Sequence, residues 1–554
     1  MTVGAFCLVL HGHLPWVMHH GRWPHGEDWL YEAAAGTWLP LIEALDAAAA
    51  EGLHPGWTLG LTPILLEQLS SDRFKQGFVR WLAERAGRAA TDAREFRAWG
   101  DDHLIGLAKR HEARFNALGD LFERLDRNIP GALSGREGVE LLSSTATHAF
   151  LPLLLHDASV RAQLRAGLAA SERHLGVLPS GIWLPECAYR PDGLWQPPDG
   201  HRPAWDRDGL GLLLGEEGVR TCFVDTHLVR GSRPVARLSG GSAEAVRGDL
   251  PPHEAWNSEL EALRVAERGA LTDLTVLARC PSVSEQVWSG KVGYPGDGAY
   301  QEFHKQHGMR GLRYWRVTGP HHDLGDKQPY DPEAAAAATY RHAQHFVQLI
   351  AERAAGHHAG TGRLATICAP FDAELFGHWW HEGPAFLLEV MRALHGRTDV
   401  VPMTVGARLA VAPADKAAAL PAGTWGAGGD DRVWWSDELR FYWSLVWRGE
   451  DRFIDLWHRA PWSTDPAHRE LLTEAGRQLL LLQASDWPFV ISTRGAVDYG
   501  LRRIADHAAR FDDLCNGVED LLAGSEPDPV VQSTLARCRL VDPVFPELDL
   551  AWWG

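Results

Sequence analysis

Short apolar runs alternate with amphipathic stretches through the first 410 residues of the chain. Apolar runs bounded by turn residues are typical of buried strands, and longer amphipathic stretches are typical of helices. The predicted strands cover residues 5–10, 57–61, 181–184, 211–215, 221–225, 274–279, 312–317 and 364–371. Amphipathic helices are predicted over 335–355 and 384–395. This alternation indicates an α/β fold, a parallel sheet covered by helices, with its chemistry at the carboxyl ends of the strands.

Three segments break the alternation. Residues 72–172 predict a helical insertion, which includes the stretch LLSSTATHAFLPLLL. Residues 228–270 are rich in Gly, Pro and Ser and predict a long loop, which is typical of a lid or a disordered segment. After about residue 411 the strand signals stop, so residues 411–554 predict a C-terminal helical domain that follows a catalytic unit of residues 1–410.

Charge and cysteine content narrow the class of protein. A formal charge of -18 argues against nucleic acid as a partner, because nucleic-acid binders need a basic surface. Seven scattered cysteines without a CxxC pair indicate neither a disulfide framework nor a thiolate zinc site. No run reaches the roughly 18 apolar residues of a membrane helix, and the first strand lacks the basic start of a signal peptide. We therefore expect a cytoplasmic protein that has no membrane partner.

Two carboxylates follow predicted strands. Glu186 follows the run GIWL, and Asp372 ends the run LATICAPF. A lone carboxylate at a strand end often caps the next helix. Two of them on separate strands, each with aromatic neighbours, favour glycoside cleavage, in which one attacks and the other protonates the departing oxygen. The rigid surroundings of Glu186 favour the nucleophile, and the bulky aromatics around Asp372 favour a raised pKa and the general acid.

A histidine pair lies at the end of the first strand. His11 and His13 are two residues apart and therefore face the same way on a strand. Such a pair can bind a metal ion or donate hydrogen bonds to a substrate. It can also be purely structural, with both rings buried and hydrogen-bonded. A metal site needs further His and Asp ligands on later strands. Those strands end in Glu186, Asp225, Arg279 and Asp372, so metal is the weaker hypothesis.

Aromatic residues are unusually prominent, with 25 Trp against 18 Phe and 9 Tyr. The flat indole suits the apolar face of a pyranose ring, although a Trp-rich core explains the count equally well. Further candidate substrate contacts, each also explicable as a turn or a cap, are Arg279, Trp288, the turn 294–296, Trp425, Trp434 and Asp486.

These motifs together resemble glycoside hydrolase family 57, and most closely its α-1,4-glucan branching enzymes. The resemblance rests on HGHLPW, GLTPILLEQL, WLPECAY, FDAELFGHWW, GTWG, VWW and ASDWPF, which occur in the family's order. It is also carried by GRWPHGEDWLYEA, GYPGDGAYQEFHK and GLRYWRVT. It covers nearly the whole chain.

The resemblance implies an incomplete (β/α)7 barrel with a helical insertion and a C-terminal helical domain that completes the cleft. It implies a retaining branching enzyme for α-glucans of the glycogen type, without metal or cofactor. Glu186 would be the nucleophile and Asp372 the acid/base. The match to the family's motifs also implies a set of substrate-binding residues, which are His11, His13, Trp23, Arg279, Trp288, Gly296, Trp425, Trp434 and Asp486.

The chain departs from the family's pattern at two positions. Branching members resemble one another in a loop that places a tyrosine over the site, whereas this chain has no Tyr between Tyr189 and Tyr294. Its candidate lid carries Trp256 instead, and Cys280 stands where the family usually has an acidic residue. The balance between branching and hydrolysis therefore stays open. The alternatives are an α-glucan hydrolase or 4-α-glucanotransferase, a metal-dependent hydrolase using the histidine pair, and a non-catalytic glycan-binding protein.

Overall fold

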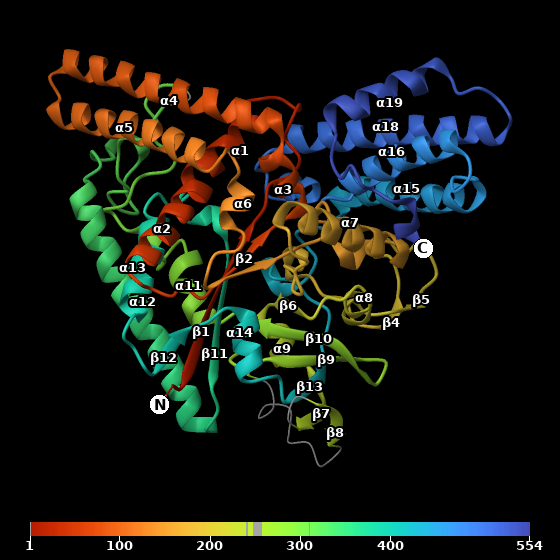
Figure 1. Cartoon of the computed structure of the whole chain (residues 1–554), viewed down its shortest axis with the longest axis horizontal. Coiled ribbons are helices and arrows are strands. Elements are labelled where there is room, and N and C mark those ends of the chain that lie inside the picture. The colour runs from red at the N-terminus through yellow and green to blue at the C-terminus, as the bar shows by residue number, and fades with distance from the viewer. Residues whose placement is uncertain (1, 240–241, 247–257, 310) are drawn as a thin grey trace.

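The computed structural model describes residues 2–239, 242–246, 258–309 and 311–554 (Figure 1). Its central parallel sheet has the order β11-β1-β2-β3. The strands are β1 (Gly4–Gly12), β2 (Trp57–Leu61), β3 (Val139–Leu142) and β11 (Ala365–Asp372), with β12 (Val400–Pro402) paired to the start of β1. Every residue of β1 and β2 is buried, as expected for a sheet covered on both faces.

A second sheet continues the first. It has the order β6-β10-β9-β13-β7-β8. Its strands are β6 (Thr221–Val224), β7 (Arg233–Ser239), β8 (Ser242–Val246), β9 (Leu263–Glu267), β10 (Ala270–Ala278) and β13 (Lys416–Ala419). The predicted strand 181–184 is reduced to parallel bridges, Ser143↔Ile182 and Gly181↔Thr221, which join β3 to β6. The succession β11-β1-β2-β3, this bridge, then β6-β10 confirms the predicted incomplete barrel.

Helices pack around the strands. They are α1 (Glu27–Ala33), α2 (Leu39–Ala50), α3 (Pro63–Ser70), α7 (Asp157–Leu175), α9 (Thr226–Arg230), α11 (Pro281–Trp288), α12 (Pro332–Thr361), α13 (Gly383–Leu394) and α14 (Val405–Val411). Of these, α11, α12 and α14 are in contact with the central sheet. Both helices predicted over 335–355 and 384–395 are confirmed as α12 and α13. Helix α12 shows why: Asp331 accepts from two main-chain N–H groups at its start, and Gly362 ends it with φ 70°.

A helical hairpin projects from this body, in orange at the upper left of Figure 1. It consists of α4 (Asp72–Trp99) and α5 (Asp102–Arg124), which pack side by side and are followed by the short α6 (Ile129–Leu133). The turn between the two long helices is fixed by Gly100 in the left-handed region and by Asp101, whose side chain accepts from the Leu104 N–H.

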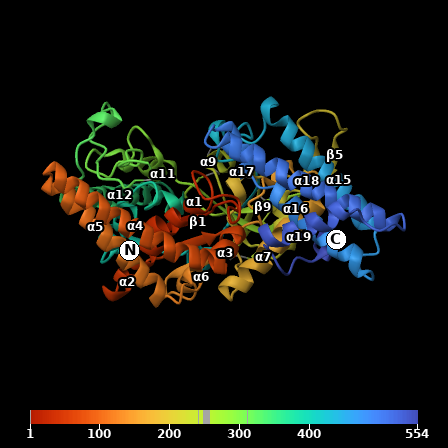
Figure 2. The same cartoon turned by 90° about the horizontal axis from the view of Figure 1, so that it is seen from above.

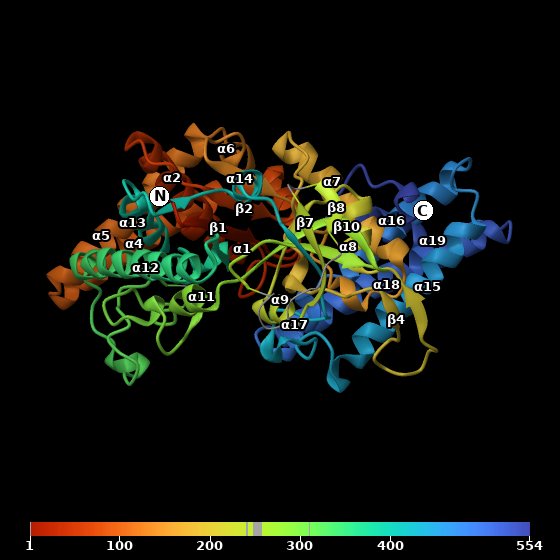
Figure 3. The ribbon, with the colours of Figure 1, turned by 90° about the horizontal axis from the view of Figure 1, so that it is seen from below.

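The C-terminal region is helical, as predicted, and its blue helices lie over one half of the molecule when it is seen from above (Figure 2). It contains α15 (Arg440–Arg459), α16 (Pro466–Leu482), α17 (Asp486–Ser492), α18 (Val497–Leu522) and α19 (Pro529–Val541). Seen from below, these helices lie at the opposite side from α12 and α13 (Figure 3). The expectation that strands stop at about residue 411 was wrong, because β13 lies at 416–419 and pairs with β7 and β9.

Two predicted strands are not strands. Residues 211–215 belong to helix α8 (Leu210–Glu216), whose first main-chain N–H groups donate to the Glu267 carboxylate. This cap comes from a distant residue and leaves no local signal. Residues 312–317 make only isolated bridges, because their main-chain groups bond to scattered partners such as Tyr300 and Gln328 rather than to one neighbouring strand.

The stretch LLSSTATHAFLPLLL, predicted to be helical, is mostly irregular. Strand β3 ends at Leu142, and only Leu151–Leu153 form a short 3-10 helix. The Ser and Thr side chains explain the failure, since they bond to the main chain and so compete with helix formation. Ser144 Oγ donates to the Trp183 carbonyl, and Thr145 Oγ1 accepts from the Ala149 N–H.

The segment 228–270, predicted to be a loop, contains β7, β8 and β9 in its described parts. Strands β7 and β9 both pair with β13, which is distant in sequence, while β8 pairs with β7 and β9 with the adjacent β10. The candidate lid residue Trp256 lies outside the described residues.

Candidate active site

Glu186 lies at the centre of the candidate site, in a tight turn formed by Pro185–Cys187. Its main chain has φ 60°, in the left-handed region that non-glycine residues rarely adopt, which is typical of functional positions held by their surroundings. Trp425 Nε1 donates to Glu186 Oε2 at 3.0 Å, and Ser485 Oγ donates to Oε1 at 3.1 Å. Burial raises the pKa of Glu186 to about 7, and these hydrogen bonds oppose the shift.

Asp372 is the last residue of β11, in register with His11 on β1. Residues paired across parallel strands point to the same face, so Asp372 and His11 share the face on which the strands end. Burial, followed by the nearby charge of Glu186, raises the pKa of Asp372 to about 7. The expectation of a raised pKa at this position is thus confirmed. The charge of Glu186 contributes to this rise, so the two carboxylates interact electrostatically.

The charges around Asp372 distinguish it from Glu186. Among the described residues no hydrogen-bond donor reaches the Asp372 carboxylate, whereas Glu186 accepts two hydrogen bonds. Hydrogen bonds from donors favour the ionised form. The hydrogen bonds therefore oppose the effect of burial at Glu186, whereas at Asp372 it is opposed by the nearby charges of His13 and Arg279.

A hydrogen-bonded chain runs from His11 to Glu186 through residues that are distant in sequence. His11 Nε2 and His148 Nε2 are 3.0 Å apart, and His148 Nδ1 lies 2.9 Å from Ser485 Oγ. Burial lowers the pKa of both histidines well below the usual range, so both rings are neutral. Since the Ser485 hydroxyl donates to Glu186, each neutral ring donates to the next group in the direction of Glu186.

His13 joins the two regions of the chain in a different way. Its Nε2 lies 2.9 Å from Asp486 Oδ2 and its Nδ1 lies 3.1 Å from Thr62 Oγ1. The main-chain N–H of His13 donates to Glu374 Oε1. Burial and the neighbouring Asp372 raise the pKa of Glu374 well above its ordinary value, and the hydrogen bond from His13 opposes the rise.

Trp425, Trp288 and Arg279 complete one wall of the site. The Trp425 ring meets the Trp288 ring edge to face, with centroids 6.1 Å apart, and the Arg279 guanidinium lies 5.9 Å from the Trp425 ring centre. Arg279 is held by Asp225, its Nη2 lying 2.6 Å from Oδ2. Its positive charge partly offsets the rise in the pKa of Asp372 that burial causes.

The arrangement is a pair of acids with opposite hydrogen-bond environments, surrounded by aromatic rings and neutral histidines. The family model for glycosyl hydrolase family 57 matches residues 7–404. The chain belongs to that family. A second model, described as the C-terminal part of 1,4-alpha-glucan branching enzymes, matches residues 446–553 of this family 57 protein.

Relatives of this family 57 protein match more than nine-tenths of the chain. It is 35% identical to a 1,4-alpha-glucan branching enzyme of Thermococcus kodakarensis, covering 93% of this chain and 73% of the relative. The crystal structure of a branching enzyme from Pyrococcus horikoshii superposes with a TM-score of 0.88 at 33% identity, covering 100% of this chain and 97% of that one. An alpha-amylase from Thermotoga maritima has a TM-score of 0.80 at 27% identity, covering 99% of each chain.

Most of the sequence-predicted site residues meet in one place. Contacts between neighbouring members bring together Glu186, Asp372, His11, His13, Arg279, Trp288, Trp425 and Asp486. His11, expected to touch a sugar, is instead 2% exposed and lies against Trp183 with ring centroids 4.4 Å apart. It contributes to the site through His148.

For three of the predicted substrate-binding residues, the structure gives no interaction that places them beside the two carboxylates in the described part of the chain. Trp434 is 1% exposed, so the expectation that it lines the groove was wrong. Its ring stacks on Phe150 and lies close to Gly426. Gly296 lies in a 3-10 turn where an added Cβ would meet open space. Trp23 is 45% exposed in the segment between β1 and α1.

Sequence reasoning missed His148 and Ser485 as members of the site. His148 lies in the stretch predicted to be helical, and its positive φ of 58° reflects the turn that aims its ring at His11. Ser485 directly precedes Asp486, which was predicted to bind substrate. This adjacency was the signal in the sequence that could have identified Ser485.

The described residues bring one set of groups close enough to share a metal ion, Asp92, Glu95 and His307, and this set lies on α4 and the segment after β10, away from the histidine pair. All seven cysteines are buried free thiols. Within the described part of the chain no helix has the length and apolar character that crossing a membrane requires.

Proposed function

We propose that this family 57 protein is a 1,4-α-glucan branching enzyme that works by a retaining double displacement. Glu186 attacks the anomeric carbon of an α-1,4 linkage, and Asp372 protonates the departing oxygen. Asp372 then removes the proton from the 6-hydroxyl of an acceptor glucan, which displaces Glu186 and forms an α-1,6 branch. Named branching enzymes among the relatives over more than nine-tenths of the chain support this activity.

The observation that carries the assignment of roles is the difference in hydrogen bonding between the two acids. Glu186 is held by Trp425 and Ser485, which orient and stabilise a carboxylate poised to attack. Asp372 has a raised pKa without such donors, which keeps it protonated for the first step. His13 and Arg279 then stabilise the Asp372 anion that remains after proton transfer, since both charges lower its pKa.

We further propose that residues 411–554 complete the catalytic cleft formed by residues 1–410. Trp425 and Ser485, the two donors to Glu186, both come from the C-terminal part of the chain. Asp486 contacts His13 of the first strand. The two parts therefore build one site, and the helical part alone would lack both acids. The scattered, unpaired cysteines are in keeping with a reducing, cytoplasmic setting for α-glucan synthesis.

The test is incubation of the purified protein with amylose, followed by proton NMR and a reducing-end assay. New α-1,6 anomeric signals at nearly constant reducing ends support branching. Rising reducing ends without α-1,6 signals would instead assign hydrolysis, the activity named for the alpha-amylase that shares this fold. The E186Q variant is the control, and loss of both signals in it assigns either activity to this site.

A further inference from the structure

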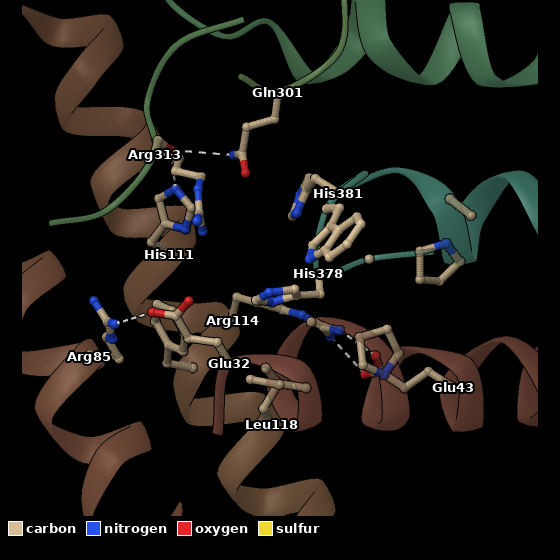
Figure 4. Close-up of a pocket in the computed structure, with 18 of the residues that line it drawn as sticks. Glu32, Glu43, Arg85, His111, Arg114, Leu118, Gln301, Arg313, His378 and His381 are labelled. Carbon is tan, nitrogen blue, oxygen red and sulfur yellow. Dashed lines mark hydrogen bonds and ion pairs between the residues drawn. The ribbon is translucent and has the colours of Figure 1, made fainter. Parts of the chain in front are cut away.

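A separate cavity of about 510 Å³ opens between the helical hairpin and the segment after Asp372 (Figure 4). Its walls come from α1, α2, α4, α5, the segment 301–313 and the start of α13. Neither Glu186 nor Asp372 lies among its lining residues. Its volume is in the range of about 300–1,000 Å³ that is typical of small-molecule sites.

Charges in the cavity balance, with one exception. Arg85 Nη2 lies 2.7 Å from Glu32 Oε1, and Arg114 donates to both carboxylate oxygens of Glu43. These two arginines are therefore paired with the two glutamates of the lining. Arg313 is the remaining cation, and among the described residues no carboxylate reaches its guanidinium within ion-pair distance. The cavity thus carries an excess positive charge.

The Arg313 side chain is fixed in place and half-buried. Its Nε donates to the Phe303 carbonyl at 2.6 Å, and its guanidinium lies 4.5 Å from the centre of the Phe303 ring. These contacts leave both Nη groups available toward the cavity. Burial lowers the pKa of Arg313, which shows that the charge is held at a cost. An anion bound to the planar pair of Nη groups would offset this cost.

Polar side chains around Arg313 have unused hydrogen-bonding atoms, which favours a ligand that carries hydroxyl groups. The His381 ring is exposed at the cavity and has no hydrogen-bond partner in the described part of the chain. Gln301 uses its Nε2 on the Arg313 carbonyl, which leaves its Oε1 as an acceptor. His111 uses Nε2 on the same carbonyl and keeps Nδ1. At the rim, the Trp379 ring is 48% exposed.

We propose that this cavity binds a phosphorylated monosaccharide, with its phosphate on the Arg313 guanidinium and its hydroxyls on His381, Gln301 and His111. The site lies apart from the catalytic acids, so the ligand is not the glucan that is cleaved. A purely apolar body would leave these polar groups unpaired, and a neutral sugar would leave the Arg313 charge uncompensated.

The test is calorimetric titration of the full-length protein with glucose 1-phosphate. R313Q is expected to weaken binding at least about tenfold, because it removes the guanidinium. A47F, on the cavity side of α2, is expected to abolish binding by filling the space while Arg313 remains. R316Q is the matched control, because Arg316 lies on the same segment outside the cavity, and it should bind within about twofold of the wild type. Raising NaCl from about 50 to 500 mM should weaken the wild-type interaction.

Several results would overturn the proposal. Glucose 1-phosphate binding that survives both R313Q and A47F would place the ligand elsewhere. Methyl α-glucoside binding as tightly as glucose 1-phosphate, with no effect of R313Q, would remove the need for the phosphate. Inorganic phosphate binding as tightly as glucose 1-phosphate would remove the need for the sugar. If R313Q does not fold, A47F and R316Q still decide between these outcomes.

Discussion

Trp425 holds Glu186 at two points. The indole Nε1 of Trp425 donates to Glu186 Oε2 at 3.0 Å, and its main-chain N–H donates to the Glu186 carbonyl at 3.0 Å. The main-chain bond belongs to a short ladder in which Gly423 and Tyr189 exchange both their hydrogen bonds. A residue of the C-terminal part thus fixes both the backbone and the carboxylate of the proposed nucleophile, in a turn whose φ is strained.

Trp425→Phe is predicted to lower kcat/KM on amylose by about 10–100-fold, because a hydrogen bond to a charged group contributes about 1.5–3 kcal/mol. Without the indole donor the pKa of Glu186 rises further, so the acidic limb of the pH–rate profile should move to higher pH. The measurement is kcat/KM between pH 5 and 8. Trp435→Phe is the control, since Trp435 packs on Trp447 away from the site. An unshifted acidic limb in Trp425→Phe would count against the role of this bond.

Asp372→Asn is predicted to separate substrates by their leaving groups. With amylose, whose departing oxygen needs a proton, loss of the general acid should cost about 10²–10⁴-fold in kcat. With a 4-nitrophenyl maltoside the first step needs no proton, so a rapid burst of nitrophenol should remain. Glu186→Gln should abolish the reaction of both substrates. Equal losses with both substrates in Asp372→Asn would mean that Asp372 is not the acid.

The raised pKa of Asp372 also predicts an effect on stability. Because its folded pKa of about 7 exceeds the unfolded value of about 3.9, the folded state binds more protons between these limits. Stability is therefore lost as pH rises from about 4 through 7. Asp372→Asn removes this cost and should raise Tm at pH 8 by a few degrees, with about 1–3 kcal/mol at stake, but should not change it at pH 4. Thermal melting at both pH values decides; a gain of equal size at pH 4 would point to another cause.

The strand that ends in Asp372, and the strands around it, were predictable because their signal is local. The runs that form β1, β6, β10 and β11 are apolar and are bounded by turns, and Asp372 and Arg279 follow directly from where two of them end. Helix α12 carries an Asp331 cap and a terminal glycine, and α13 has a proline in its first turn and a periodic apolar face.

The remainder of the site depends on contacts between distant segments. His148 reaches His11 only because polar side chains turn the chain away from a helix after β3, and Ser485 reaches Glu186 only after the C-terminal helices have packed. Trp434 and Trp425 lie in the same Gly-rich stretch, yet Trp434 is buried and Trp425 faces Glu186. Residue type does not distinguish them, because burial is decided by the packing of Phe150 and Gly426 around Trp434.

Ser485→Ala is predicted to lower kcat about tenfold without changing the fold. The substitution removes the donor to Glu186 and ends the chain from His148, so Glu186 loses one of the two bonds that favour its anion. The pH–rate profile should shift in the same direction as in Trp425→Phe, which a purely structural role would not produce. Ser492→Ala serves as the control, since the Ser492 Oγ donates, in an exposed hydrogen bond, to the Phe489 carbonyl within α17. Wild-type kinetics in Ser485→Ala would show that this chain does not affect Glu186.

Asp542 ties the segment after β1 to the C-terminal helices. The carboxylate is fully buried and accepts from His20 Nε2 at 2.7 Å and from Arg510 Nη1 at 2.7 Å. Burial alone would raise the pKa of Asp542, but the His20 bond and neighbouring positive charges hold it well below its usual value. Its contribution to stability is therefore present above about pH 4 and is lost as pH falls further. Asp542→Asn removes the close partner of the buried Arg510 charge and leaves it only the longer contact to Asp506 at 3.8 Å, which should cost about 3 kcal/mol at pH 7. Urea unfolding at pH 7 measures this loss, and the difference from the wild type should narrow below pH 4. Glu526→Gln, at an exposed position after α18, should change stability by less than about 0.5 kcal/mol. A loss that is as small in Asp542→Asn would show that the two regions are held together by apolar packing alone.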